Sequence, residues 1–499
     1  MAETAKKSIT VRAGRCATMP GAKQEGITVR KSENFDEWYT QVILKAEISD
    51  YSPVSGCMVL RPAGYAIWEQ IQRATDERLK KLGVQNTYFP LFIPERLLRK
   101  EQEHVEGFSP EVAWVTEAGD SRLDERLAIR PTSETIMYEV VSRWIRSWRD
   151  LPLKLNQWNN VVRWEFRHPT PFLRTREFLW NEGHTIYATR EEAEAERDQI
   201  LGVYRSVTEE FLALPGYVGR KTESEKFAGA VASYSIEHLL PDGKAIQGPD
   251  FHFDGQKFSK AFEISFVDEK GERKYAWQNT WAITTREIGV MLAVHGDDRG
   301  AVIPPRVAPL QVVVVPIFNE ETKERVLPEA RKLAGRLGEK FRARVDDRVH
   351  LTPGWKFNEW ELKGVPLRVE FGPKEVEEES AVLVPRDTGK KRSVKTRDIV
   401  REVESELEAI QGRLLARAEE ALRSGTHSAS SLSELREIIK GRGGIVLAPW
   451  CGSEECERKV KEETGAKIIN LPLDGESEAL KCVNCGRGAL TVARFARSY

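Results

Sequence analysis

Apolar residues recur at intervals of three and four positions in residues 65–82, and Gly83 follows them. This spacing predicts an amphipathic helix, and a glycine directly after it is a typical stop signal. Residues 86–93 then predict a strand that contains Pro90 and is closed by Pro94. Because proline lacks the N–H that a sheet ladder needs, such a strand should lie at an edge or an interface. The apolar positions of the helix are Trp68, Ile71, Thr75, Leu79 and Leu82.

A strand–loop–strand pattern follows in residues 153–186. Residues 153–166 are rich in β-branched and aromatic side chains, and residues 178–186 resume the apolar pattern. Between them, residues 168–171 read His-Pro-Thr-Pro, which has the composition of a turn or loop. The two arms therefore predict one hairpin that holds several charged residues close together. These are Arg163, Glu165, Arg174 and Arg176.

The other segments before residue 305 mix helices and strands without a βαβ rhythm. A helix should open at Pro131 to Glu134, residues 202–221 read as a helix and then a strand, and residues 262–267 alternate like a half-buried strand. Residues 277–286 read as a strand that runs into another helix. This order predicts an antiparallel sheet flanked by helices and argues against a Rossmann core. The apolar faces expected for the two helices are Met137, Val140, Val141, Trp144 and Trp148, and Ile288, Met291, Leu292 and His295.

A second domain is predicted after Pro304, Pro305 and Pro309. Strand-like and helical runs alternate from residue 311 to about 400, which indicates a small α/β domain, and residues 399–422 predict a charged amphipathic helix. We therefore expect a multidomain α+β chain. The predicted divisions are a loosely ordered N-terminus (1–28), a catalytic domain (29–305), a small α/β domain (306–405) and a C-terminal metal-binding α/β domain (406–499).

Composition narrows the class of protein. The 499 residues include 76 basic and 77 acidic side chains, so nucleic acid would have to bind through local patches rather than a general positive field. The first nine residues contain lysines but no apolar core, so no secretory signal is predicted. The apolar run at 312–318 is too short to cross a bilayer. We expect a cytoplasmic protein without membrane contact, a setting in which disulfides are disfavoured.

Four of the six cysteines form two close pairs near the C-terminus. Four residues separate Cys451 from Cys456, two separate Cys482 from Cys485, and 25 lie between the pairs. Two pairs of thiolates at such spacing favour a closed, tetrahedral structural zinc site. Disulfides or idle buried thiols are the other interpretations. The isolated Cys16 and Cys57 are expected to be ordinary thiols.

The hairpin arginines suit phosphate, because a guanidinium offers a planar fork of donors and keeps its charge. A solvated hairpin with surface ion pairs is the alternative. Segments 163–165 and 174–178 resemble motif 2 of class II aminoacyl-tRNA synthetases, an Arg-x-Glu followed by a loop and an Arg-x-x-x-Phe arm. The helix at 65–82 with the proline-containing strand resembles motif 1, the dimer-forming element. The strand that runs into a helix near Arg286 resembles motif 3.

Taken together, the chain resembles prolyl-tRNA synthetases of the archaeal/eukaryotic type from about residue 33 to residue 499. Phe178 and Arg286 are only 108 positions apart, which leaves no room for the large editing insertion of bacterial-type relatives. The most specific matches are Arg-Pro-Thr-Ser-Glu-Thr at 130–135, Phe-Leu-Arg-Thr-Arg-Glu-Phe-Leu-Trp-Asn-Glu-Gly-His at 172–184, Pro-Gly-Trp-Lys-Phe-Asn-Glu-Trp-Glu-Leu-Lys-Gly at 353–364, the cysteine spacing and the final Tyr499.

The resemblance implies that ATP and Mg²⁺ serve to convert L-proline to prolyl-adenylate, which then esterifies tRNA(Pro). Proline's carboxylate is already ionised at neutral pH, so the reaction needs charge neutralisation and placement rather than a general base. Arg163 would bridge the α-phosphate and the proline carboxylate, Glu165 would meet the adenine amino group, and Arg174 would hold the γ-phosphate. Arg286 would grip the phosphates or stack on adenine. Further ATP-binding residues would be Thr175, Gln247, Asp250 and Thr284.

The amino-acid pocket must recognise the secondary ammonium group of proline and the small apolar ring beside it. By the same resemblance, Thr132 and Glu134 would take the ammonium by charge-assisted hydrogen bonds. The pair also fits a helix N-cap with an early acidic residue, which is the other interpretation. The pocket would be shaped by Arg163, Trp180, Glu182, His184 and His252. The two histidines could equally be satisfied core residues.

Two stretches depart from the family pattern. Relatives usually carry Gln-(Ala/Gly)-Gly-Thr-Ser-His where residues 247–252 place Asp250 and Phe251, and Ala282 replaces the usual glycine of motif 3. An added carboxylate could repel phosphate, bind Mg²⁺ or alter the amino-acid pocket. Two alternatives to a proline–tRNA ligase therefore stay open: a non-catalytic tRNA-binding paralogue, and a ligase for another small amino acid.

The α/β domain at 306–405 would bind the anticodon arm of the tRNA. RNA loops are recognised by stacking and by hydrogen bonds to base edges, and arginine pairs well with guanine edges. A solvated charged face is the alternative interpretation. A homodimer is implied by the motif 1 resemblance. The candidate anticodon residues are Trp355, Trp360, Lys363, Arg368, Glu370 and Arg386.

Overall fold

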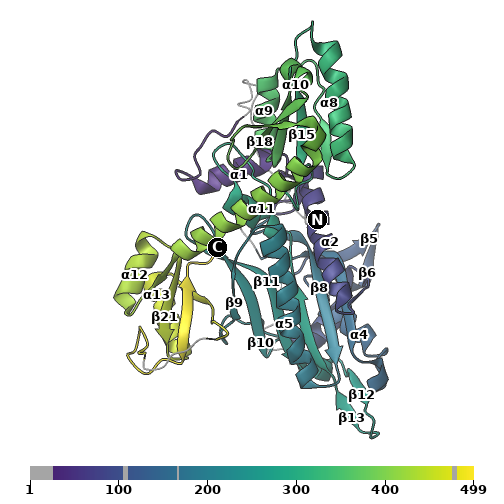
Figure 1. Cartoon of the computed structure of the whole chain (residues 1–499). Helices are drawn as coiled ribbons and strands as arrows, with labels where there is room; N and C mark the ends of the chain where they lie inside the picture. The colour runs from purple at the N-terminus through teal and green to yellow at the C-terminus, as the bar shows by residue number, and fades with distance from the viewer. Residues whose placement is uncertain (1–25, 105–110, 166–167, 475–479) are drawn as a thin grey trace, which may run out of the picture.

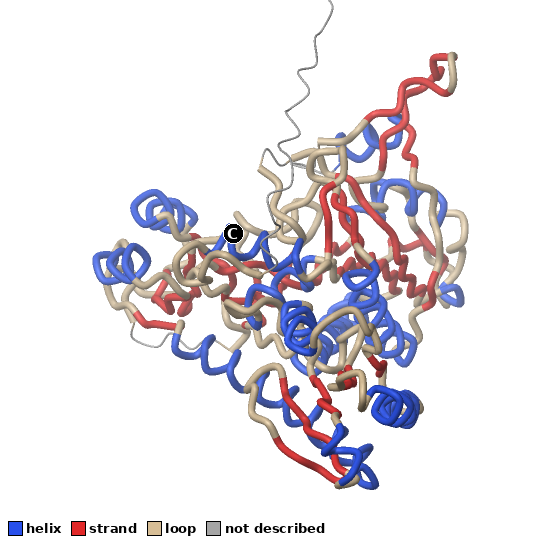
Figure 2. Tube along the Cα trace, turned by 90° about the horizontal axis from the view of Figure 1, so that it is seen from above, coloured by secondary structure: helices blue, strands red, loops and turns tan. Residues whose placement is uncertain are grey.

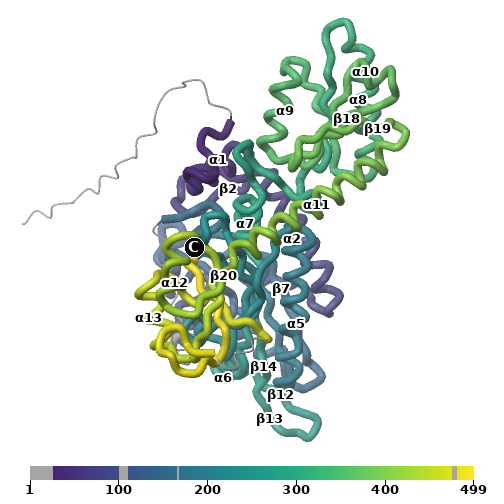
Figure 3. Tube along the Cα trace, turned by 60° about the vertical axis from the view of Figure 1, so that its left-hand side comes forward, coloured from purple at the N-terminus to yellow at the C-terminus, as the bar shows by residue number. Residues whose placement is uncertain are grey.

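The computed structural model describes residues 26–104, 111–165, 168–474 and 480–499. A large domain carries a smaller domain at one end and a C-terminal domain at its side, and helix α11 (Ile399–Ser424) runs between the last two (Figure 1). A second view shows the same arrangement (Figure 3). Cys16 and nearly all of the predicted N-terminal segment 1–28 lie outside the described residues.

The large domain is built on a seven-stranded sheet with the order β3-β7-β8-β14-β11-β10-β9. All neighbours are antiparallel except β3 and β7, so the predicted fold class is confirmed and a Rossmann core is excluded. Strands β7 and β8 pair along their whole length, which confirms the predicted hairpin. The strands are β3 (Gln85–Asn86), β7 (Leu153–Val162), β8 (Glu177–Tyr187), β14 (Trp277–Ala282), β11 (Ala245–Gly255), β10 (Ala232–Leu239) and β9 (Tyr217–Arg220).

Several helices gather along one side of these strands (Figure 2). Together with the sheet they form the main hydrophobic core, in which Trp38, Trp68 and Trp281 are fully buried. A smaller core lies under two short helices and includes Leu155 and Ile186. Within the described residues, no helix has both the length and the apolar character needed to cross a membrane. The helices are α1 (Phe35–Lys45), α2 (Pro62–Lys81), α5 (Arg190–Ser206) and α7 (Arg286–His295) in the main core, and α4 (Glu134–Val141) and α6 (Lys257–Ala261) in the smaller one.

Smaller elements surround the large sheet. They are a three-stranded sheet with the order β4-β6-β5, two hairpins and three short helical segments. Their bounds are β4 (Phe92–Pro94), β5 (Trp114–Ala118), β6 (Ser121–Ile129), β1 (Ser49–Tyr51), β2 (Met58–Leu60), β12 (Ser265–Val267), β13 (Arg273–Tyr275), α3 (Glu95–His104), the 3₁₀ helix η1 (Trp148–Asp150) and the π-helix η2 (Val207–Phe211).

The small domain is a five-stranded mixed sheet with the order β16-β15-β17-β18-β19. Strand β15 is parallel to both of its neighbours, as the predicted α/β pattern requires, and the last two pairings are antiparallel. The elements are β15 (Val312–Pro316), α8 (Lys323–Gly338), β16 (Ala343–Val345), α9 (Pro353–Leu362), β17 (Leu367–Phe371), α10 (Pro373–Glu377), β18 (Ser380–Pro385), β19 (Arg392–Lys395) and the 3₁₀ helix η3 (Thr396–Asp398).

The C-terminal domain is a four-stranded sheet with the order β20-β21-β23-β22 and two helices. It touches the large domain at β9, where Arg220 and Leu471 exchange two backbone hydrogen bonds of 2.9 and 2.7 Å. The elements are β20 (Thr426–Ser428), α12 (Leu432–Gly441), β21 (Ile445–Trp450), α13 (Glu454–Thr464), β22 (Lys467–Asn470) and β23 (Thr491–Ala496).

Several predicted elements were wrong. The strand expected at 86–93 is two short strands in different sheets, and Pro90 lies between them. The helix expected to reach Trp148 ends at Val141, and Trp144 is 46% exposed, so an amphipathic spacing continued past the end of the helix. The helix expected from Gly202 already begins at Arg190, with Thr189 as its cap.

Candidate active site

A cavity of about 460 Å³ opens on one face of the large sheet. Trp180, Glu182 and His184 of β8 line it, because side chains two positions apart on a strand share a face. Asp250 and His252 of β11 line it for the same reason. The remaining wall comes from further residues of β8, β11 and β14, from the loops before α4, after β7 and after β9, and from the starts of α4 and α7. It includes Pro131, Thr132, Glu134, Arg163, Glu165, Thr175, Phe178, Lys221, Glu225, Lys226, Phe227, Gln247, Thr280, Ala282, Thr284 and Arg286.

Every residue predicted to bind ATP or proline lines this cavity except Arg174. The Arg174 guanidinium instead donates a 2.8 Å hydrogen bond to the backbone oxygen of Tyr499. It belongs to a neighbouring cavity of about 410 Å³, which also includes Lys244. The final residues thus reach the large domain, where Tyr499 N donates to Ala245 O at 2.9 Å.

Arg163 lies just past the end of β7 and is oriented by three contacts. Its Nε donates to Pro131 O at 3.0 Å. Its guanidinium lies 5.5 Å from the ring centre of Phe178 and 5.2 Å from that of Trp180. Aromatic faces attract a cation without neutralising its charge, so the guanidinium stays available to an anion in the cavity.

Arg286 is the first residue of α7 and is half-buried in the cavity wall. Its Nη1 donates to Gln247 O at 3.0 Å, and its backbone N–H donates to Thr284 Oγ1 at 3.0 Å. Burial lowers the pKa of Arg286 from its ordinary value, because removing a charge from water disfavours the charged form. An anionic ligand would relieve this cost, and the positive end of the helix dipole adds to the attraction.

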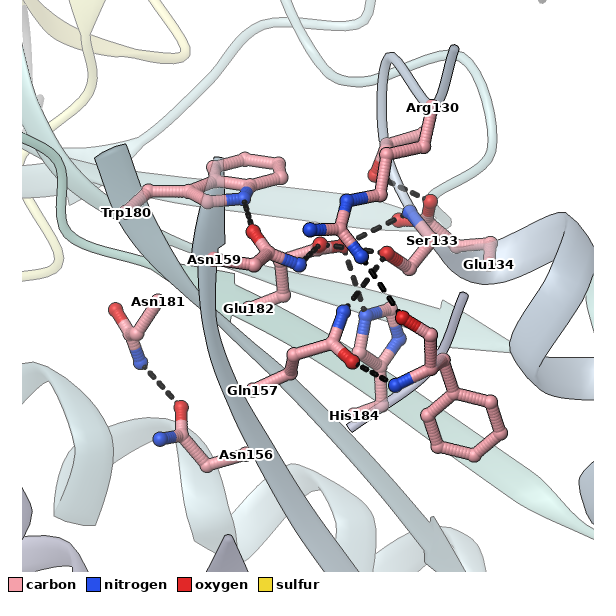
Figure 4. A network of polar contacts seen from close by, with 12 residues as sticks. Arg130, Ser133, Glu134, Asn156, Gln157, Asn159, Trp180, Asn181, Glu182 and His184 are labelled. Carbon is pink, nitrogen blue, oxygen red and sulfur yellow. Dashed lines mark hydrogen bonds and ion pairs between the residues drawn. The ribbon is translucent and has the colours of Figure 1, made fainter. Parts of the chain in front are cut away.

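Glu182 is the centre of a buried polar network (Figure 4). Its carboxylate accepts hydrogen bonds from Ser133 N at 2.8 Å, Ser133 Oγ at 2.6 Å and Asn159 Nδ2 at 2.5 Å, and His184 Nε2 lies 3.3 Å away. Burial raises the pKa of Glu182, but the hydrogen bonds from His184, Asn159 and Ser133 outweigh it and hold the pKa below the ordinary value. Glu182 is therefore an ionised group that fixes the loop before α4.

This network corrects one interpretation of Thr132. Thr132 is not the N-cap of α4: that position is Ser133, whose side chain donates to Glu182 instead of capping the helix. The Thr132 hydroxyl donates to the carboxylate of Glu134, the first residue of the helix. A hydroxyl and a carboxylate therefore lie together in the cavity wall.

The two histidines have protein partners and also line the cavity. His184 Nδ1 lies 3.1 Å from Tyr138 Oη. His252 Nδ1 lies 2.8 Å from Ser233 Oγ, and its ring centre lies 5.0 Å from that of Phe227. Both interpretations of these residues thus have support, since each histidine is satisfied and each faces the site.

The departures from the family pattern fall at the centre of the wall. Asp250 accepts a 2.9 Å hydrogen bond from Gln247 Nε2, lies 3.6 Å from His252 Nε2 and is paired across strands with Ala282. Phe251 points to the other face, where it is fully buried in the main core. Asp250 is therefore already engaged by two neighbouring side chains.

Sequence reasoning missed the segment after β9. Residues 221–228 have no periodic pattern, yet they close one side of the cavity with a set of mixed charge. One sequence signal could have revealed this segment. It is the presence of two cationic side chains, Lys221 and Lys226, in a stretch with neither helical nor strand periodicity. The missed residues are Lys221, Glu225, Lys226, Phe227 and Ala228.

The four C-terminal cysteines converge as predicted. Their sulfur atoms all lie within 4.8 Å of one another, and those of Cys451 and Cys485 are 3.7 Å apart. A tetrahedral zinc with Zn–S bonds of about 2.3 Å places its sulfurs about 3.8 Å apart, so the group fits. Asn484 Nδ2 and Arg487 Nε donate toward two of the sulfurs at 3.2 and 3.4 Å. None of the cysteines in the described ranges, Cys57 included, forms a disulfide.

The candidate anticodon residues are divided. Arg368 and Arg386 line a cavity of about 140 Å³ with Trp360, whereas Lys363 and Glu370 are not in its wall. Arg368 donates to Glu370 at 3.0 Å, and Arg386 donates two hydrogen bonds to a carboxylate of the large domain. Lys363 pairs with two carboxylates at 2.9 and 3.0 Å. Trp355 lies outside this wall.

Three family profiles match the chain in order. They are "tRNA synthetase class II core domain (G, H, P, S and T)" over residues 114–295, "Anticodon binding domain" over 311–406 and "Prolyl-tRNA synthetase, C-terminal" over 432–499. The proline–tRNA ligase of Natranaerobius thermophilus is 51% identical over 456 residues, which cover 91% of this chain and 94% of the relative. The chain belongs to the prolyl-tRNA synthetase family.

Two further relatives agree with this membership. The proline–tRNA ligase of Cenarchaeum symbiosum is 50% identical over 476 residues, covering 95% of this chain and 99% of the relative. The crystal structure of prolyl-tRNA synthetase from Cryptosporidium parvum, complexed with halofuginone and AMPPNP, is similar with a TM-score of 0.90 and 45% identity, covering 95% and 100% of the two chains. This prolyl-tRNA synthetase ligates proline to tRNA(Pro), and neither alternative function is favoured.

Proposed function

We propose that proline activation takes place in the 460 Å³ cavity, with Arg163 and Arg286 as its catalytic residues. The observation that carries this proposal is that two arginines from distant segments line one cavity beside a hydroxyl and a carboxylate. Arg163 bridges the α-phosphate of ATP and the proline carboxylate, so that both anions are neutralised while the carboxylate attacks. Arg286 neutralises charge on the phosphates.

Proline binds at the end of the cavity formed by Thr132, Glu134 and β8. Glu134 balances the secondary ammonium charge, and Thr132 orients Glu134. Glu182 acts through Ser133, because its network fixes the loop that carries Thr132. The remaining proline-site residues, which shape the apolar part of the pocket, are Trp180, His184 and His252.

ATP binds at the other end, with Glu165 accepting from the adenine amino group. Arg174 reaches the γ-phosphate only when its side chain turns away from Tyr499. Magnesium on the triphosphate would supply additional positive charge, and Asp250 offers the hard carboxylate oxygen that this ion prefers. The remaining nucleotide contacts proposed are Thr175, Gln247 and Thr284.

Three features outside the cavity complete the proposal. Zinc would be held by Cys451, Cys456, Cys482 and Cys485 in a closed site without a catalytic role. The small domain would read the anticodon of tRNA(Pro), with Arg368 and Arg386 as the stronger candidates because they share one cavity. The protein would act as a homodimer through α2 and the strands around Pro90.

Exchange of pyrophosphate into ATP, measured with each of the twenty amino acids, tests the assignment. We expect exchange that depends on proline and is lost in Thr132→Val at proline concentrations that saturate the wild type. Exchange with none of the amino acids would indicate a binding protein. Exchange with a different small amino acid would overturn the proline pocket while preserving the nucleotide site.

A further inference from the structure

The C-terminal domain contacts the cavity wall through the segment that sequence analysis missed. Residues 221–228 follow edge strand β9 with an irregular backbone. On their inner side, Phe227 N donates to Ser233 Oγ at 3.0 Å, and the same hydroxyl lies 2.8 Å from His252 Nδ1. The segment therefore meets the cavity at the proposed proline end.

The outer side of the same segment is held from the C-terminal domain. Thr222 Oγ1 donates to Glu457 Oε1 of α13 at 2.9 Å, and both residues are buried. The ammonium group of Lys467 lies 2.5 Å from Glu225 Oε2, and both side chains are mostly shielded from water. Glu225 is itself a residue of the cavity wall.

A buried cation extends this attachment. Lys221 Nζ donates to Glu237 Oε1 of β10 at 2.5 Å and to Ile469 O of β22 at 2.8 Å. One ammonium group therefore joins the central sheet, the segment and the C-terminal domain. Leaving such buried donors and acceptors without partners is costly, so the segment's position depends on the domain that supplies them.

We propose that Glu457 and Lys467 are positioning residues for the proline site: they hold residues 221–228 against His252 and thereby set the affinity for proline. Neither residue touches the cavity, and each acts through a member of its wall. When these contacts are absent, the segment spends part of its time away from His252. The apparent affinity then falls in proportion to the fraction of molecules that keep the closed arrangement. This inference rests on the proposed proline end of the cavity.

Lys467→Met and Glu457→Met test the proposal. We expect the KM for proline in pyrophosphate exchange to rise about fivefold or more, while kcat and the KM for ATP stay within about twofold. Amide hydrogen exchange in peptides covering 221–228 should become faster. Glu457→Gln keeps the acceptor oxygen and should restore the wild-type values. Lys459→Met is the matched control, because that lysine pairs with Glu455 at 3.0 Å on the exposed face of the same helix.

Two results would overturn the coupling. One is an unchanged KM for proline with unchanged hydrogen exchange in Lys467→Met, which decides the question even if Glu457→Met fails to fold. The other is an equal rise in the KM values for proline and ATP, which would indicate a general structural role. Thr132→Val separates this inference from the proposed function. If it raises the KM for proline and Lys467→Met does not, only the coupling is wrong; if neither does, the proline end itself is misplaced.

Discussion

Arg163 follows strand β7 and Arg286 opens helix α7, yet both residues line one cavity. The two differ in what surrounds them: aromatic rings flank Arg163, whereas Arg286 is half-buried at the first turn of a helix and donates to the backbone oxygen of Gln247. Arg174 shares the hairpin with Arg163 but bonds to Tyr499. The contacts already made by each guanidinium therefore determine which arginine is ready for a phosphate.

Replacing either cavity arginine should remove catalysis without unfolding the protein. We expect Arg163→Ala and Arg286→Ala each to lose about 2.7–4 kcal/mol of transition-state stabilisation, or roughly 10²–10³-fold in exchange rate, as for a lost oxyanion donor. Arg176→Ala is the matched control on the same hairpin, since Arg176 bonds to Ser55 O at 3.1 Å and stacks on Trp164 outside the cavity. Near-normal exchange in Arg163→Ala or Arg286→Ala, at unchanged circular dichroism, would remove that arginine from the mechanism.

Site residues could be predicted from the sequence where they lie within a local motif. Glu182 lies on a strand whose alternation fixes the face of each side chain, and Arg163 directly follows the partner strand, so their place in the cavity followed from the hairpin pattern and the resemblance. The position of Arg174 did not, because its partner Tyr499 lies 325 positions away. Lys221 and Glu225 were missed for the same reason: residues of the C-terminal domain hold the segment.

The junction of β16 and α9 contains a buried carboxylate that makes stability depend on pH. Asp346 accepts hydrogen bonds from Arg348 at 2.6 and 2.8 Å and from Trp360 Nε1 at 2.8 Å. Burial alone would raise the pKa of Asp346, but the hydrogen bonds from Arg348 and Trp360 lower it to about 2. A carboxyl with a lowered pKa stabilises the fold above its ordinary pKa of 3.8, and this contribution is lost as pH falls from there through about 2.

Asp346→Asn should therefore make the free energy of unfolding depend less on pH in the acid range. We expect the difference in unfolding free energy between wild type and variant to be largest above pH 4 and to shrink as pH is lowered toward 2. Denaturant titrations at a series of pH values measure it. Asp347→Asn is the adjacent control, since Asp347 pairs with Arg331 at an exposed position. A difference that stays constant over this range would contradict the role of Asp346.

The cysteine cluster ties α13 to the loop around Cys482 and Cys485. If it holds zinc, purified protein should contain about one equivalent, and chelation should lower the unfolding temperature of the C-terminal domain, because the metal binds the folded state. Cys485→Ser should reproduce the effect, whereas Cys57→Ser, a cysteine outside the cluster, should not. Less than half an equivalent after gentle purification would refute the metal site.

At the scale of elements, strongly periodic helices could be predicted from the sequence. The points at which an element ends or the chain changes sheet could not. The α11 helix matches its predicted span of 399–422 to within two residues, because a long apolar stripe specifies it. The strand expected around Pro90 failed because the chain passes there from the seven-stranded sheet to the three-stranded one, and an apolar run does not reveal a change of sheet. The helix from Glu134 ended early for a similar reason, since spacing alone does not mark where backbone bonding stops.

At the scale of the whole molecule, helix α11 links the small domain to the C-terminal domain. It is 26 residues long, which corresponds to about 39 Å at 1.5 Å per residue. Gln411, near its middle, donates from Nε2 to Glu210 O at 2.8 Å and to Phe211 O at 3.3 Å. Its Oε1 accepts from Arg306 N at 3.3 Å. One buried amide thus fixes the long helix against the large domain at the point where the small domain begins.

Gln411→Leu should separate the two half-reactions. Adenylate formation uses only the cavity, so proline-dependent exchange should stay within about twofold, whereas kcat/KM for tRNA charging should fall about fivefold or more, because one tRNA must reach two domains at a fixed separation. Glu408→Gln serves as control, since Glu408 pairs with Arg306 at an exposed position, where ion pairs contribute little. Equal losses in both assays would rule out this role of α11.

Strand β9 is the last strand of the large sheet, and its outer side is covered by the C-terminal domain through the backbone pairing of Arg220 with Leu471. An uncovered strand of this kind presents a row of unsatisfied N–H and C=O groups to any other chain. A chain shortened before residue 425 would expose that row. Its first failure in solution should therefore be self-association through strand addition, visible by light scattering, rather than a loss of the adenylate chemistry itself.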